Sequence, residues 1–163
     1  EELGGIGATE AVGRTGTVTG TMTIAGSEVT AAKFEVDLTT IRSNESRRES
    51  RIQEALETDR FPTATFELTQ PLELGSDAAT GGEQSVTAAG DLTIHGVTKE
   101  VVLDVTGPAA EAKDPWGNIK TGFEATTTVN RKDFGVGPGT PVAIVGEEVT
   151  ITLDIEVAKK VAK

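Results

Sequence analysis

Residues 90–105 limit most strongly what this chain can fold into. Apolar side chains take alternate positions on both sides of the pair His95-Gly96: Leu92, Ile94, Val101, Leu103 and Val105. Two such runs predict a β-hairpin with one apolar face and one mostly polar face. Gly96 supplies the positive φ that a two-residue hairpin loop needs, and histidine tolerates that region better than most residues. The remaining chain must then provide further sheet to cover the apolar face.

The same period of two recurs elsewhere and predicts further antiparallel strands. The runs cover residues 17–25, 29–40, 63–71, 122–129 and 149–157. Alternation is cleanest in 29–40 and 149–157, which is typical of strands with one buried and one solvated face. Residues 75–84 and 137–141 are rich in glycine, and we expect both to be loops. Residues 114–118 are expected to form a turn that contains Trp116.

One segment between two of these strands changes to helical periodicity. Ser46 and Glu49 fit a capping box, with Ser46 as the N-cap. Ile52 and Leu56 then fall on one helix face, which predicts a short amphipathic helix over residues 47–57. Arg48 lies one turn before Ile52 on this face, as an arginine at the edge of a buried stripe or as a ligand contact.

The whole chain of 163 residues is expected to be one domain, residues 1–163, because it has no internal repeat and no linker. Aromatic residues make up only 4% of it, while threonine, valine, glycine and alanine are plentiful, which favours strands. Seven or eight antiparallel strands must close into a barrel or fold into a sandwich to protect their edges. The pattern predicts an all-β fold with a helical insert and does not separate these two architectures.

Charge and composition exclude several classes of function. The net charge of −11 argues against a nucleic acid or an anionic membrane surface as the main partner. The absence of cysteine excludes disulfides and thiolate chemistry. No run of about 18 apolar residues is present, so we expect no transmembrane segment. The chain begins at Glu1 without a methionine, which is compatible with a processed, exported protein.

A search for catalytic motifs finds little. His95 is the only histidine, and it lies at the predicted tip of the hairpin, where a turn role is expected. Nucleophile elbows, phosphate-binding loops and zinc-protease motifs are absent from the sequence. The carboxylates mostly fall on the solvent-facing positions of strands. We therefore expect no enzymatic activity, no metal and no cofactor.

One charged residue breaks the alternation of the central hairpin. Lys99 has the same parity as Val97 and Val101, so a regular strand would direct it to the apolar side. A β-bulge near the turn or a lysine reaching the rim would resolve this conflict. If the interior holds a lipid, Lys99 or Arg48 could contact its polar head group.

Several motifs, in order, resemble the YceI-like family of polyisoprenoid-binding, lipocalin-like proteins. Residues 90–99, Gly-Asp-Leu-Thr-Ile-His-Gly-Val-Thr-Lys, look like its G-x-L-T-I-x-G-V-T-K signature. Arg48-Glu49 and residues 61–66, Phe-Pro-Thr-Ala-Thr-Phe, are similar to its Arg-Asp helix and F-P-x-A-x-F strand. Residues 114–117 and 130–135 resemble its D-P-x-G turn and its N-R-x-D-F-G element, and 147–151 its last strand. Glu49 departs from the usual Asp, and the first strand is shortened.

The resemblance implies an eight-stranded, extended antiparallel barrel with a short helical insert. Its apolar interior would hold an isoprenoid, either a polyprenyl lipid or a quinone tail, as a bound ligand and not as a cofactor. Many members of the family are exported, so the resemblance also implies a periplasmic, secreted or cell-surface location, with the cytoplasm as the alternative. Edges left by the shortened first strand would favour a homodimer.

Alternation and resemblance together predict which side chains line this interior. They are Phe34, Val36, Leu38, Ile52, Leu56, Phe66, Leu68, Leu92, Ile94, Val101, Leu103, Trp116, Phe123, Phe134, Ile151 and Leu153. Among these, Ile52, Leu56, Trp116 and Phe134 are expected near the ends of the barrel. Three alternatives stay open: a fatty acid, an amide or another amphiphile as cargo; a filled β-sandwich that serves as an interaction module; and a small lipid isomerase.

Overall fold

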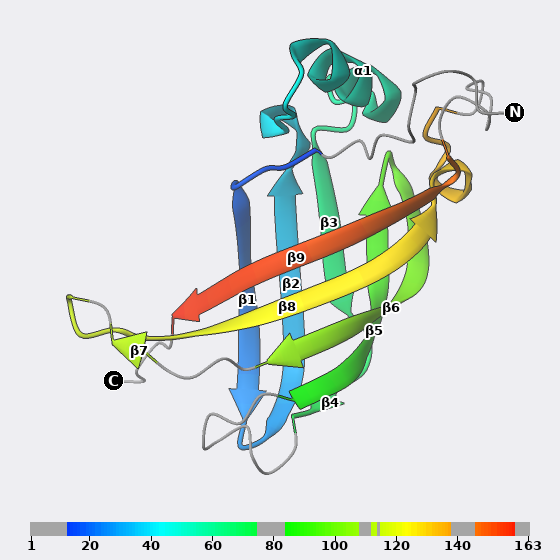
Figure 1. Ribbon diagram of the computed structural model, residues 1–163. Helices are drawn as coiled ribbons and strands as arrows, with labels where there is room; N and C mark the ends of the chain where they lie inside the picture. Colours follow the sequence, from blue (N-terminus) through cyan, green and yellow to red (C-terminus); the bar gives the residue numbers. More distant parts are fainter. Residues whose placement is uncertain (1–12, 75–83, 108–111, 114, 138–145, 159–163) are drawn as a thin grey trace, which may run out of the picture.

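The computed structural model describes residues 13–74, 84–107, 112–113, 115–137 and 146–158 (Figure 1). Nine antiparallel strands form one sheet: β1 (Val18–Ala25), β2 (Glu28–Asp37), β3 (Thr63–Leu68), β4 (Leu72–Glu73), β5 (Gln84–Ile94), β6 (Val97–Gly107), β7 (Ala112–Lys113), β8 (Ile119–Asn130) and β9 (Glu148–Ala158). One helix, α1 (Ser46–Leu56), and two 3-10 turns, η1 (Leu38–Thr40) and η3 (Arg131–Phe134), complete the described elements.

The sheet curls into a half-barrel. Its strand order is β1-β2-β3-β5-β6-β8-β7, with β4 paired to β2 and β9 paired to β8. Strands β8 and β9 cross over the face of β1, β2 and β3, while α1 lies at one end (Figure 1). In the described part of the chain, β1 and β9 are not hydrogen-bonded to each other. The predicted all-β, lipocalin-like architecture with one short helix is therefore confirmed, and its circle of strands stays open between β1 and β9.

Two long hairpins carry most of the pairing. Strands β5 and β6 pair over eleven residue positions, and so do β8 and β9. By contrast, β6 and β8 pair over three positions only, Asp104–Thr106 of β6 against residues 124–126 of β8. A narrow joint thus connects two extensive ladders.

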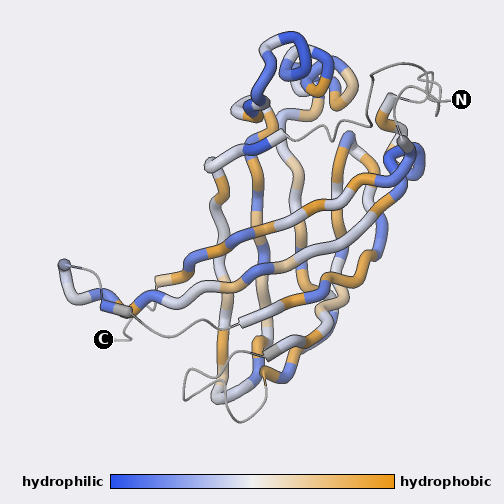
Figure 2. The backbone as a smooth tube through the Cα atoms, in the orientation of Figure 1, coloured by the Kyte–Doolittle hydropathy of each residue, from blue (hydrophilic) through white to orange (hydrophobic). Residues whose placement is uncertain are grey.

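The central hairpin has the predicted geometry. His95 and Gly96 adopt φ values of 55° and 71°, as a two-residue type I′ turn requires. The β5–β6 register is continuous from Ile94 opposite Val97 down to Gln84 opposite Gly107. Hydrophobic and hydrophilic positions alternate along the strands, whereas α1 is mostly hydrophilic (Figure 2).

The helix is present, but its predicted cap is wrong. It starts at Ser46, so Glu45 is the N-cap, and Glu45 makes no side-chain capping bond. Glu49 instead reaches back beyond the cap, where its Oε2 accepts a hydrogen bond from the Ser43 N–H at 3.3 Å. At the other end, Glu57 closes the helix in the left-handed conformation with φ of 49°.

The predicted strand 29–40 ends three residues early. Asp37 terminates β2 because its carboxylate accepts a hydrogen bond from the Thr39 N–H at 2.9 Å, which starts η1. Leu38 is consequently a buried residue of a 3-10 turn and not of a strand. The expectations for residues 1–12, 75–83 and 138–141 lie outside the described residues.

Candidate functional site

The inner face of the half-barrel gathers most of the predicted wall residues into one apolar cluster. Its buried centre is formed by the inward side chains of β2, β3, β5, β6 and β8, together with η3: Phe34, Phe66, Leu92, Leu103, Phe123 and Phe134. Half-buried residues pack around them, namely Leu68, Ile94, Val101, Ile151 and Leu153. The parity predicted from the sequence therefore placed the ten strand residues of this set on the correct face, while Phe134, predicted near an end of the barrel, enters the cluster from the 3-10 turn η3. Whether they contact a ligand stays a prediction.

Two of the central phenylalanine rings lie along the wall of the half-barrel. A Cβ atom placed on Gly20 would come within 2.5 Å of the Phe34 ring, and one placed on Gly90 within 2.3 Å of the Phe66 ring. Each ring therefore covers the bare backbone of a glycine on a neighbouring strand, an arrangement that stabilises glycine in sheets. The rings lie against adjacent strands instead of projecting straight across the interior.

The side of the interior near β9 is apolar and only partly covered. Ile151, Leu153, Ile155 and Val157 all point inward and pack against the central cluster, yet each remains half-buried. On β1, Met22 is half-buried and Ile24 is 45% exposed. We refer to this border between β1 and β9 as the open seam. It combines apolar side chains, partial exposure and two edges that are not bonded to each other.

One end of the half-barrel, beneath α1, is closed by a second, smaller apolar cluster, and we call it the α1 border. Leu38, Ile41 and Ala64 form its buried part, and Val36, Ile52 and Leu56 pack against it. Ile94 contacts both clusters and so connects this cap with the main interior. Ile52 and Leu56 therefore lie near one end, as predicted.

Trp116 does not belong to the interior. Its side chain is 83% exposed on the turn that connects β7 with β8, where Gly117 adopts a φ of 88°. The sequence indicated a turn here, and a turn that projects beyond the sheet carries its aromatic residue away from the core. The prediction that Trp116 plugs the barrel is wrong.

The two predicted head-group residues lie at different margins. Lys99 is exposed and pairs in regular register opposite Leu92, so of the two alternatives the β-bulge is excluded and an exposed lysine at the rim agrees with the structure. The half-buried Arg48 donates from Nη1 to Asn44 Oδ1 at 2.6 Å, and its Nη2 is 4.0 Å from Glu45. Their contact with a head group stays a prediction.

His95 does more than the turn role expected from the sequence. Its Nε2 is bonded to Glu57 Oε2, and its Nδ1 is 3.1 Å from the backbone carbonyl of Phe134. The Phe61 ring packs on the imidazole, with centroids 4.7 Å apart. The His95 hydrogen bond, assisted by Arg60, lowers the pKa of Glu57 below its ordinary value. The His95 side chain thus joins Glu57, 38 positions before it, to the backbone of Phe134, 39 positions after it.

A buried arginine was also missed by the sequence analysis. The guanidinium of Arg131 donates to the backbone carbonyls of Gly146, Val136 and Gly137 at 2.5–3.0 Å. It thereby connects residues 136–137, which follow η3, to Gly146, which precedes β9. Neighbouring Lys132 binds Glu147 and lowers the pKa of that carboxyl. The Asn-Arg-x-Asp-Phe-Gly motif is the one sequence signal that pointed to this place.

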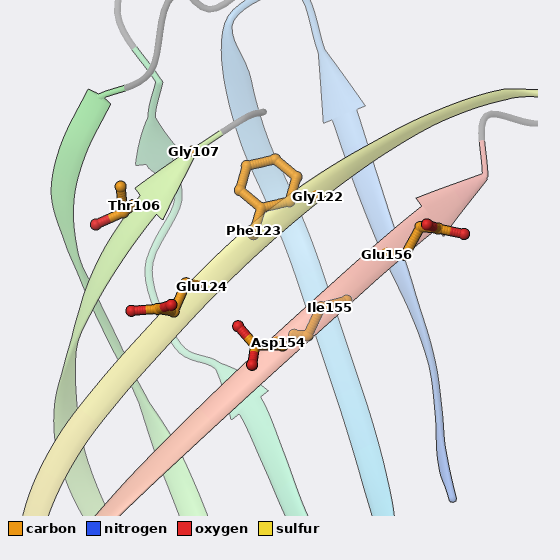
Figure 3. A pocket seen from close by; sticks show the side chains of 8 residues that line it. All are labelled: Thr106, Gly107, Gly122, Phe123, Glu124, Asp154, Ile155 and Glu156. Carbon is orange, nitrogen blue, oxygen red and sulfur yellow. The ribbon is translucent and has the colours of Figure 1, made fainter. Parts of the chain in front are cut away.

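A hollow of about 500 Å³ lies where β6, β8 and β9 meet, and two of its lining residues, Phe123 and Ile155, also belong to the apolar cluster of the interior (Figure 3). Its polar lining includes the exposed carboxylates of Glu124, Asp154 and Glu156, the last held by Lys120 at 2.9 Å. Within the described residues, His, Asp and Glu form no group that could bind a metal ion. No helix of the described part is long and apolar enough to span a bilayer.

The fold and the interior define an antiparallel half-barrel of the lipocalin-like class, lined by aliphatic and aromatic side chains. The family model of the YceI-like domain matches residues 2–157. The chain belongs to this family, as the motifs predicted.

Curated relatives carry the name UPF0312 protein. The one from Pseudomonas putida strain W619 is 39% identical over 132 residues, which cover 78% of this chain and 62% of the relative. Its counterpart from Pseudomonas fluorescens strain Pf-5 is 42% identical over 108 residues, covering 64% and 53% respectively. The chain thus spans less than two thirds of the length of these relatives.

Solved structures share the fold at low sequence identity. The Campylobacter jejuni YCEI protein aligns with a TM-score of 0.79 at 17% identity, covering 98% of this chain and 91% of its own. Burkholderia cenocepacia BcnA gives 0.68 at 18% identity, with 89% and 86% covered. A polyisoprenoid binding domain from Saccharophagus degradans gives 0.52 at 20% identity, with 90% and 82% covered.

Proposed function

We propose that this domain binds a long apolar lipid, an isoprenoid chain such as a polyprenyl lipid or a quinone tail, within the half-barrel and without chemical conversion. One observation carries the proposal. The inward side chains along β9 are apolar and belong to the core cluster, but they remain half-buried at the open seam. An occupant with a long hydrocarbon chain would cover this surface.

The chemistry of the interior fits such an occupant. A polyprenyl chain has no hydrogen-bonding groups along its length, so its site needs apolar walls with polar groups only at the margins. Each buried methylene contributes roughly 0.8 kcal/mol, so several isoprene units would bind tightly without a specific polar contact. The polyisoprenoid binding domain of Saccharophagus degradans, which shares the fold, adds support from its name.

The first test identifies what the protein carries. The purified protein is extracted with organic solvent, and the extract is analysed by mass spectrometry. A prenyl lipid in the extract supports the proposal. A fatty acid, an amide or another amphiphile would instead show that the domain binds a different class of ligand. If nothing is extracted and the protein stripped of lipid binds no prenyl probe, the domain is a filled interaction module.

A matched pair of variants on β9 locates the site. Leu153 points inward and Thr152, its neighbour, points outward. Leu153→Gln places an amide in the apolar wall, so we expect weaker binding of a fluorescent prenyl probe, while Thr152→Gln leaves binding unchanged. Equal affinities in both variants would contradict a site in the interior.

Head-group contacts remain part of the proposal. Lys99 stands at the rim on the inner face of β6, and Arg48 stands on α1. Lys99→Met is expected to abolish discrimination between probes with anionic and neutral head groups and to leave their common chain affinity intact. Unchanged discrimination removes Lys99 from the site.

The proposal includes export and a homodimer. Export to the periplasm, the medium or the cell surface is supported by the family resemblance and is tested by fractionation of the producing cells. A dimer is supported by the unpaired edges of β1 and β9 in the described residues and is tested by light scattering.

A further inference from the structure

The cap formed by α1 and the main half-barrel meet at His95. This residue occupies the tip of the β5–β6 hairpin, next to Ile94, which contacts both apolar clusters. Its side chain is only 13% exposed. One ring nitrogen is bonded to the last residue of the cap, Glu57, and the other to η3, through the carbonyl of Phe134. His95 therefore connects three segments: the β5–β6 hairpin, the end of α1 and η3.

Both partners of the imidazole are hydrogen-bond acceptors. The Phe134 carbonyl can only accept, and the Glu57 carboxylate, whose pKa is lowered, is ionised and also can only accept. Both ring nitrogens must then carry a proton for the two bonds to exist together, so this geometry selects the imidazolium form. A neutral ring has one N–H and can keep only one of the two bonds.

We propose that doubly protonated His95 is the positioning residue that latches α1 over its end of the interior, and that loss of one proton loosens this latch. The functional consequence, that a loosened cap speeds lipid exchange, rests on the proposed lipid-binding function. The latch itself, however, is a property of the protein alone. The latch holds while both ring nitrogens carry a proton and Glu57 is ionised, and it weakens when the ring loses one proton.

The charged groups around the imidazole fit this assignment. On the cap side, Arg60 binds the other carboxylate oxygen of Glu57 at 3.0 Å and stacks on Phe61, while Asp59 is exposed. On the η3 side, Arg131 is directed to backbone carbonyls, Lys132 is paired with Glu147, and Asp133 is exposed. On the hairpin, the nearest charged side chains in sequence are Asp91, which is half-buried and pairs opposite Glu100, and Lys99, which is exposed. Glu57 is thus the carboxylate that binds the ring.

Contacts of α1 with the barrel explain why the latch controls the cap. The helix has no fully buried residue, and it packs through the half-buried side chains of Ile52 and Leu56. Gln53 Nε2 also donates a hydrogen bond to the Thr39 carbonyl at 3.2 Å, and the charged bond between Glu57 and His95 adds to these contacts at the end of the helix.

Hydrogen exchange of the α1 amides tests the latch without any lipid. Exchange is measured from about pH 5.5 to pH 8.5, the range in which histidine titrates, and corrected for the intrinsic pH dependence of amide exchange. We expect protection of α1 to fall severalfold as pH rises, while protection of the β8–β9 ladder stays constant. Protection of α1 that does not change with pH would overturn the proposal.

Three variants separate a protonation-dependent latch from simple packing. His95→Asn retains a residue that tolerates positive φ, and it should give low α1 protection at every pH. Glu57→Gln should abolish most of the pH dependence of α1 protection. Glu54→Gln, an exposed glutamate on the same helix, is the matched control and should behave as the unmodified protein. A pH dependence that persists in Glu57→Gln would contradict the assignment.

Release of a fluorescent prenyl probe from loaded protein tests the consequence. We expect faster release at high pH, and pH-independent release from His95→Asn at the fast rate. If the probe never binds, the proposed function fails, but the exchange experiment still decides the latch. If the probe binds and its release ignores both pH and His95→Asn, the gating role is overturned although lipid binding stands.

Discussion

The two borders of the half-barrel are built in opposite ways. Under α1 the interior ends in a second apolar cluster, which polar contacts through His95 and Glu57 join to the barrel. At the open seam, β9 and β1 present half-buried apolar side chains and strand edges that do not pair with each other. The first border is closed by specific, charged contacts, and the second is only partly covered by non-specific apolar surface. Under the proposed lipid-binding function, one defined end and one adaptable side would allow the domain to accept chains of variable length.

The largest loss of stability is expected for a substitution in the buried centre of the interior, which lies between the two borders. Phe66 is 6% exposed and its ring covers Gly90. Phe66→Ala removes a buried ring and leaves a cavity, so we expect the free energy of unfolding to fall by about 3–5 kcal/mol. Urea denaturation monitored by circular dichroism measures it. A loss as small as that of an exposed residue would show that the ring is not part of a packed core.

A smaller loss is expected on the closed side, at Arg131. Arg131→Met retains an unbranched chain but removes the donors to three backbone carbonyls, which lose their partners in a buried place. Each unsatisfied buried group costs about 1–3 kcal/mol, and water will reach some of them, so we expect a total near 2–3 kcal/mol. Urea denaturation is again the measurement. Lys132→Met, in the exposed neighbour, is the control and should cost far less.

Substitutions at the open seam should destabilise the protein less than those in the centre or at Arg131. Leu153→Ala shortens a half-buried side chain, so we expect a cost of about 1–2 kcal/mol, below the usual range for a fully buried leucine. Thermal unfolding of the lipid-free protein measures it, with Trp116→Ala as a control expected to stay within about 0.5 kcal/mol. A cost equal to that of Phe66→Ala would mean that the seam is closed in solution.

The last prediction concerns the stability of the protein at acidic pH, to which Glu57 contributes at the α1 border. The pKa of Glu57 is lowered from its ordinary value of 4.5 by the His95 and Arg60 hydrogen bonds. Its contribution to stability is therefore complete above about pH 4.5 and is lost as pH falls through the lowered value. Glu57→Gln should be less stable near pH 6 and should lose less stability than the unmodified protein between pH 5 and pH 3. Parallel acid curves of the melting temperature would rule out this contribution.

Alternation in the sequence was sufficient for the inner wall. Phe34, Phe66, Leu103 and Leu153 could be assigned because a strand of period two leaves one face for apolar residues. Leu38 is buried as expected, but its assignment to a strand was wrong. The side chain of Asp37 ends β2 through a local hydrogen bond that competes with strand pairing. Trp116 failed because hydrophobicity alone does not tell whether a turn folds over the core or away from it.

The latch could not be predicted from the sequence for a different reason. Glu57 looked like the tail of an amphipathic helix and His95 like a turn residue, and both descriptions are correct locally. Their contact depends on the left-handed end of α1 and on the position of η3, which only the folded chain brings together. The buried Arg131 could not be predicted for the same reason, since its carbonyl partners are Val136 and Gly137, just after η3, and Gly146, just before β9.

The narrow joint between β6 and β8 has a consequence for how the domain can change its capacity. Only three residue pairs connect the long β5–β6 ladder to the long β8–β9 ladder in the described chain. Each ladder can therefore keep its full complement of backbone hydrogen bonds while the angle between them changes at the joint. For the proposed lipid ligand, a thicker or thinner chain would then require a change in this one angle and no loss of strand pairing.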